Sequence, residues 1–122
     1  MKLTSSKKIL MIVAAILVCG LAYYFGVALP ARNQGQALLD KHSQAAGRYM
    51  QEKNYAAAAK EWRQIVRLQP DDPDAQLWLG TTLYRSGQKR EAAEVFKKLA
   101  TRNDYAGEAA KKMLRNKLNV KS

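Results

Sequence analysis

Cysteine and histidine are almost absent from this sequence, with one of each in 122 residues. A disulfide within the chain is therefore excluded, and a zinc site or a Cys-His nucleophile pair lacks the residues it needs. Cys19 also lies inside a long apolar stretch, far along the chain from His42. The seven glycines are scattered, and none forms a phosphate-binding loop between a strand and a helix. We therefore expect no enzyme, no cofactor and no metal.

Acidic residues are also scarce, since 10 Asp and Glu face 21 Lys and Arg and give a formal net charge of +11. Such a balance favours an acidic partner, which could be a peptide, a lipid surface or a nucleic acid. Charge alone does not choose among them. Without the apolar stretch near the start, roughly 90 residues remain, which is enough for one small domain.

Charged residues are missing from Ile9 to Leu29, which follow a basic segment at residues 1–8. As a helix these 21 residues span about 31 Å, close to the hydrocarbon thickness of a bilayer. Tyr23, Tyr24 and Phe25 lie near the far end, where aromatic rings prefer the headgroup level, and Pro30 discourages a regular helix beyond it. The pattern predicts a transmembrane helix at 9–29.

A cleaved signal peptide is the alternative, because Lys2, Lys7 and Lys8 form a basic start and Gly26–Ala28 offers small residues for cleavage. The apolar run is longer than the roughly 7 to 15 residues of a signal peptide, which favours an uncleaved signal anchor. More lysines precede the span than follow it closely, which favours a cytoplasmic N-terminus. In a bacterium the rest of the chain would then lie in the periplasm, anchored in the inner membrane.

Helical patterns fill the sequence after a polar segment at 30–38, which we interpret as a linker or the frayed beginning of a helix. Apolar residues between Tyr55 and Val66 recur on one helical face, with Asn54 as the N-cap and an end near Gln69, just before Pro70. Three further features complete the pattern: a helix capped by Asp72 that runs from Pro73 to Ser86 and ends at Gly87, a helix at about 88–101, and a last helix capped by Asp104 that ends near Leu118.

The helices repeat along the chain with an offset that aligns Leu39 with Pro73. The alignment pairs Ala45-Ala46 with Leu79-Gly80, Tyr49 with Leu83, Ala58 with Ala92, Trp62 with Phe96, and Ile65 with Leu99. These residues, with Pro70 at the closing position, resemble the tetratricopeptide repeat (TPR), a helix-turn-helix unit of about 34 residues. The resemblance implies an all-α fold with repeats at 39–72 and 73–106, followed by a basic capping helix and tail at 107–122.

The sequence departs from the repeat pattern at several positions. His42 and Gln76 replace the usual tryptophan, Lys89 replaces the aromatic that Tyr55 supplies, and Asp104 replaces the closing proline. Two repeats are also fewer than the three that normally stack into a continuous core. We therefore expect the domain to borrow burial from its last helix, from a second copy or from a partner.

The first helix of each repeat lines the concave face of a TPR array, so the resemblance also implies a peptide-binding groove. Trp78 is either an anchor in this groove or, as we favour, packs against the last helix. The residues that bind the C-terminal carboxylate of chaperone tails in some TPR domains are missing, because Ser43 and Gly47 stand at two of those positions. Apolar and cationic groups suit a peptide with an acidic group or a C-terminal carboxylate. The groove residues are Met50, Leu77, Thr81, Tyr84, Arg85, Lys111 and Arg115.

Together these patterns predict a membrane-anchored TPR module that binds a protein and acts as an assembly, scaffold or chaperone-like subunit of a bacterial envelope complex. One alternative is a membrane-surface or nucleic-acid binder that uses the cations after Glu108, although the tail lacks base-stacking aromatics. Another is an organelle import receptor with a cytosolic TPR domain. The tail cations are Lys111, Lys112, Arg115, Lys117 and Lys121.

Overall fold

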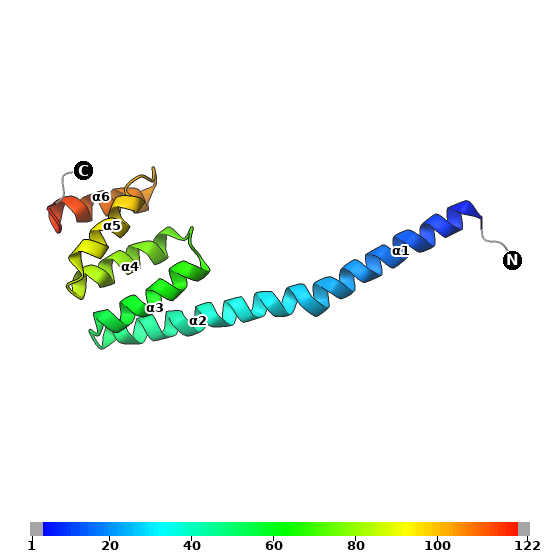
Figure 1. The fold of residues 1–122 in the computed structure, drawn as a ribbon, viewed down its shortest axis with the longest axis horizontal. Helices are drawn as coiled ribbons and strands as arrows, with labels where there is room; N and C mark the ends of the chain where they lie inside the picture. Colours follow the sequence, from blue (N-terminus) through cyan, green and yellow to red (C-terminus); the bar gives the residue numbers. More distant parts are fainter. Residues whose placement is uncertain (1–3, 120–122) are drawn as a thin grey trace. The chain divides into compact units, whose positions relative to one another are not determined.

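The structure is a computed structural model that describes residues 4–119, so the predictions for Lys2 and Lys121 lie outside the described residues. The described part consists of helices and turns without a strand, which confirms the all-α class. It forms two units, the residues up to Ala37 and those from Leu38 onward. The elements in chain order (Figure 1) are α1 (Ser5–Tyr23), η1 (Tyr24–Ala28), α2 (Leu29–Gln51), α3 (Tyr55–Leu68), α4 (Pro73–Arg85), α5 (Lys89–Leu99) and α6 (Tyr105–Asn116).

The N-terminal helix is long and apolar enough to cross a membrane. Its side chains from Ile9 onward through α1 are exposed, as expected for residues that have no protein core to cover them. The expectation that Pro30 discourages further helix is wrong, because α2 contains Pro30. The π-helical turn η1 directly precedes it, and a widened turn relieves the clash between a proline ring and the carbonyl four residues earlier.

Residues 30–38, interpreted as a linker or a frayed helix start, are helical within α2. Their composition explains this outcome, since Ala, Arg, Gln and Leu predominate there and all four are good helix formers.

Side-chain caps fix the starts of α3, α4 and α6. The Asn54 side chain accepts a hydrogen bond of 3.2 Å from the Ala57 amide, and the Asp72 carboxylate accepts one of 2.9 Å from the Asp74 amide. Asp104 accepts from the amides of residues 106 and 107, each at 3.1 Å. The three predicted N-caps are therefore confirmed. Gly87 follows α4 with φ of 87°, the left-handed conformation predicted for that helix end.

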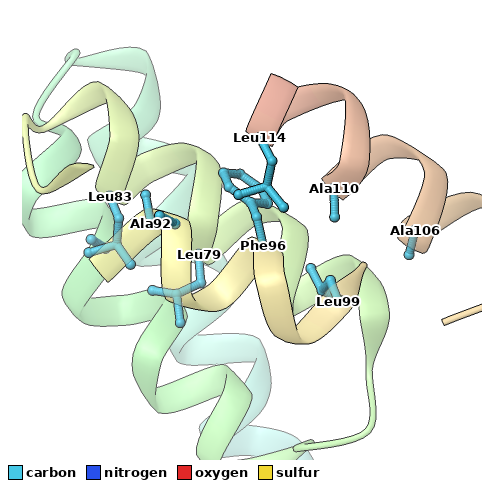
Figure 2. Close-up of a cluster of buried hydrophobic side chains, with 10 residues drawn as sticks. Leu79, Leu83, Ala92, Phe96, Leu99, Ala106, Ala110 and Leu114 are labelled. Carbon is cyan, nitrogen blue, oxygen red and sulfur yellow. The ribbon is translucent and has the colours of Figure 1, made fainter. Parts of the chain in front are cut away.

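The core of the second unit lies between consecutive helices, since α3 packs on α4, α4 on α5 and α5 on α6, while α6 also contacts α4. Figure 2 shows Phe96 and Leu99 of α5 directed toward the small and apolar side chains of α6. The buried residues of the cluster are Ala59, Leu79, Leu83, Ala92, Ala93, Phe96, Leu99, Ala106, Ala110 and Leu114.

Trp62 and Phe96 occupy equivalent positions but are not equally buried. Phe96 is fully enclosed, whereas Trp62 is only partly buried, although its Nε1 is buried and has no hydrogen-bond partner among residues 4–119. The Trp62 ring stacks on Trp78 of α4 with centroids 5.9 Å apart, and Trp78 stays 47% exposed. Trp78 therefore covers the ring of Trp62, a role different from the groove anchor and from the packing against the last helix that we considered from the sequence.

The residues of α6 that pack on the core come earlier in the sequence than the repeat length predicts. Along α4 the buried residues Ala75, Leu79 and Leu83 are spaced by four, and along α6 Ala106, Ala110 and Leu114 repeat that pattern. The cause is α5, which has 11 residues where the equivalent helix α3 has 14. A residue of α6 therefore corresponds to the α4 residue 31 positions earlier, as Tyr105 does to Asp74. This offset is shorter than the one that aligns Leu39 with Pro73 and relates the two repeats.

Candidate protein-binding groove

The groove residues of α4 share one side of that helix. Leu77, Thr81 and Tyr84 are spaced by four and three residues, which places them on neighbouring turns of the same face. All three are partly buried, and Leu77 and Tyr84 pack against the core cluster. The face is therefore held by the core beneath it and still reaches solvent. Met50, the remaining apolar residue of the predicted groove, is partly buried near the end of α2.

Arg85 lies at the end of this face and is held by Tyr55 of α3. Its guanidinium carbon lies 5.3 Å from the centroid of the Tyr55 ring, and Nη1 donates a hydrogen bond of 3.4 Å to the Tyr55 hydroxyl. A cation over an aromatic face is favourable and restricts the side chain without neutralising its charge. Arg85 remains exposed, so its charge is available to an acidic ligand.

On α6 the predicted groove cations differ in their surroundings. Lys111 is partly buried and its Nζ lies 2.8 Å from Glu108 Oε1, an ion pair that holds the pKa of Glu108 below its usual value. Arg115 is exposed and forms no ion pair within the described residues. With the offset of 31, Lys112 and Arg115 correspond to Thr81 and Tyr84 of α4. Lys111 corresponds instead to Gly80.

Asp74 and Tyr105 join the beginnings of α4 and α6. The Tyr105 hydroxyl donates a short hydrogen bond to Asp74 Oδ1, and this bond is the main cause that raises the pKa of Tyr105 to about 12. The two residues occupy equivalent positions on their helices. Their contact was not predicted from the sequence. A signal was present, because the caps Asp72 and Asp104 lie closer together along the chain than a full repeat, which indicates that the second repeat is short.

The polar residues at the two usual tryptophan positions have partners. His42 is partly buried, and its Nδ1 lies 2.6 Å from Glu61 Oε2. Because an ionised carboxylate only accepts hydrogen bonds, Nδ1 is the donor. Gln76 donates through Nε2 to the carbonyl of Pro70. The first contact joins α2 to α3, and the second joins α4 to the turn that precedes it.

A metal site is not evident in residues 4–119, where no three His, Cys, Asp or Glu side chains lie close enough to share an ion. Asp72 caps α4 and Asp74 accepts from Tyr105, so two of the three aspartates around Pro73 have structural hydrogen bonds.

The tetratricopeptide repeat family profile matches residues 43–107, more than half of the chain. The chain therefore belongs to the tetratricopeptide repeat family. The domains of this family are typically non-catalytic modules that bind proteins. Comparison with curated proteins and with solved structures gives no significant match.

Proposed function

We propose that this chain is a membrane-anchored TPR protein that holds a protein partner near a bilayer, as an assembly, scaffold or chaperone-like subunit of a bacterial envelope complex. Membership of the TPR family carries the binding part of this proposal. The helix that is long and apolar enough to cross a membrane supports the anchor. Lys7 and Lys8 lie in the first turn of that helix, just before its uncharged run from Ile9, and favour a cytoplasmic N-terminus. In a bacterium the TPR domain would then lie in the periplasm.

The partner contributes an extended segment with an acidic side chain or a C-terminal carboxylate. Leu77 and Tyr84 supply apolar contact beside Thr81, while Arg85 and Arg115 supply exposed positive charge at the ends of α4 and α6. A hydrogen bond to a charged group contributes roughly 1.5 to 3 kcal/mol. Met50 extends the apolar part, and Lys111 adds a cation that is shared with Glu108. Tyr and Arg side chains are common centres of binding energy, and Tyr84 packs against the core.

The test uses the full-length chain in native membranes, crosslinked and purified with its partner. Replacing Arg85 and Arg115 by Glu should lower the recovered partner at least tenfold. The matched control replaces Lys60 and Lys98 by Glu, since both are exposed cations of the second helices of the repeats and neither forms an ion pair within the described residues. Thermal melting of both variants checks that the helices remain folded. Equal recovery from the groove variant and the control would contradict the groove.

A further inference from the structure

A second cationic surface lies where the start of α5 meets the end of α6. A cavity of about 350 Å³ is formed there by residues from these two segments. Ala93 and Leu118 are its apolar residues, and no acidic side chain lines it. The lining residues are Lys89, Arg90, Ala93, Lys117, Leu118 and Asn119.

The three cations of this cavity are not neutralised by the described residues. The nearest acids along α5 are already paired, because Arg63 Nη2 lies 2.7 Å from both oxygens of Glu91 and Lys97 Nζ lies 3.1 Å from Glu94 Oε1. Lys89, Arg90 and Lys117 form no ion pair within residues 4–119. Three positive charges therefore line one hollow to which the described residues contribute no acidic side chain, while Glu91 and Glu94 line the adjoining hollow together with Arg90.

The position of the first two cations adds to this excess. Lys89 and Arg90 are the first residues of α5, where the helix dipole is positive, and the side chain of Gln88 forms no cap there. Cations at this end of a helix are unfavourable, and Glu91, the acidic residue of the same turn, is bound to Arg63 of α3. A bound anion would relieve both the mutual repulsion of the side chains and the field of the helix.

A neighbouring apolar hollow shares Lys117 with the cationic cavity. Its volume is about 310 Å³, and Ala109 and Met113 are its apolar residues beside Lys112 and Asn116. Lys117 therefore lies between a cationic hollow suited to an anion and an apolar hollow suited to a hydrocarbon group. A free phosphate or a carboxylate would use only the first of these hollows. A single-stranded nucleic acid would need stacking rings, and no aromatic residue lines either hollow.

We propose that the two hollows together bind an anionic phospholipid, with the phosphate and acidic headgroup beside Lys89, Arg90 and Lys117 and the glycerol and acyl portion against Ala109 and Met113. No residue of α4 lines either hollow. The inference rests on the anchor in the proposed function, because an apolar helix in the bilayer keeps the domain at a high effective concentration near lipid headgroups.

The test titrates full-length protein in an uncharged detergent with dihexanoylphosphatidylglycerol. Methyl chemical shifts report on Ala93 in the first hollow and on Met113 in the second. We expect saturable shifts at both methyls, and at least a tenfold loss of affinity when Arg90 and Lys117 are both replaced by Glu. Replacement of Lys60 and Lys98 by Glu should change the affinity less than twofold. If the charge reversal disturbs folding, Arg90→Gln with Lys117→Gln should still weaken binding several-fold.

The separate arms distinguish the sources of the anion. Dihexanoylphosphatidylcholine and inorganic phosphate should shift these methyls weakly. Equal shifts with inorganic phosphate would overturn the lipid assignment. Equal losses of lipid affinity in the two double variants would also overturn it, because they would indicate a diffuse attraction between the lipid and the positive charge of the domain. Partner recovery separates this site from the groove, because the Arg90 and Lys117 variant should lose lipid and keep the partner. Loss of the partner in that variant would assign the surface to the partner and contradict the proposal.

Discussion

The ring of Phe96 occupies the space that a side chain on Gly80 would need. A Cβ built on Gly80 would lie 2.7 Å from Phe96 Cε1 and 2.8 Å from Cζ, closer than carbon atoms pack in proteins. The contact joins the first and second helices of the second repeat, since Gly80 belongs to α4 and Phe96 to α5. The glycine of the repeat pattern is thus required by close approach of the helices.

Gly80→Ala should therefore destabilise the domain by roughly 1 to 3 kcal/mol, the range for overpacking a core. Thermal melting of the full-length chain measures the change. Gly47 provides a matched control, because it is an exposed helical glycine and, apart from its chain neighbours and its own helix backbone, no described atom lies within 4 Å of the position that a Cβ would take. Gly47→Ala should be neutral or stabilise by about 0.5 to 1 kcal/mol. Similar melting of the two variants would contradict the packing described for α4 and α5.

Gly107→Ala should be more damaging than Gly80→Ala. A Cβ on Gly107 would lie 2.1 Å from the Arg102 carbonyl oxygen and 2.9 Å from its carbonyl carbon, so the obstacle is backbone and not the far end of a side chain. The start of α6 would have to move away from the preceding turn. Urea unfolding compares the two variants, and a smaller loss for Gly107→Ala would show that the turn adapts more easily than the core does.

Stability should depend on pH through Tyr105 at the alkaline end. The hydrogen bond to Asp74 favours the neutral phenol and raises its pKa to about 12, above the ordinary value of 10.0. The contribution is therefore complete below about pH 10 and is lost as the pH rises through about 12. The difference in tyrosinate absorbance between the parent and Tyr105→Phe isolates this titration. Asp74→Asn should return it toward 10, and an unchanged curve would refute the coupling.

The two equivalent aromatics should differ in their contribution to stability. Phe96→Ala removes a fully buried ring and should cost about 3 to 5 kcal/mol, enough to unfold a small domain. Trp62→Ala should cost less, because Trp62 is partly exposed and its buried Nε1 finds no acceptor in the described part of the chain. Denaturant unfolding of the two variants ranks them. A larger loss at Trp62 would mean that its stack with Trp78 contributes more than its burial indicates.

Much of the fold was predictable because its signals are local. Asn54, Asp72 and Asp104 cap helices through their own nearby amides. The repeat offset pairs Ala58 with Ala92 without knowledge of the structure, and both are fully buried. The helix through Pro30 was not predicted, because the preceding π-helical turn has no clear sequence signal.

The candidate site was less predictable, because its register depends on the length of one helix. The repeat offset aligns Lys111 with Leu77, whereas the shorter α5 aligns it with Gly80 and aligns Lys112 with Thr81. The place of Lys111 in the groove stays a prediction. The cavity of Lys89, Arg90 and Lys117 depends on α5 packing against α6, which no local pattern encodes. Lys117 is far along the sequence from Lys89 and Arg90, so the sequence alone does not show that the three residues line one cavity.

Photocrosslinking from single positions of the full-length chain in native membranes tests the central claim, that a protein partner occupies the concave side of α4. A photoreactive residue at Thr81 samples the groove, and one at Glu94, an exposed position of α5, samples a surface outside it. We expect one discrete protein crosslinked from position 81, lost when Arg85 and Arg115 are both replaced by Glu, and none from position 94. Equal crosslinking from both positions, or none from position 81, would contradict the claim.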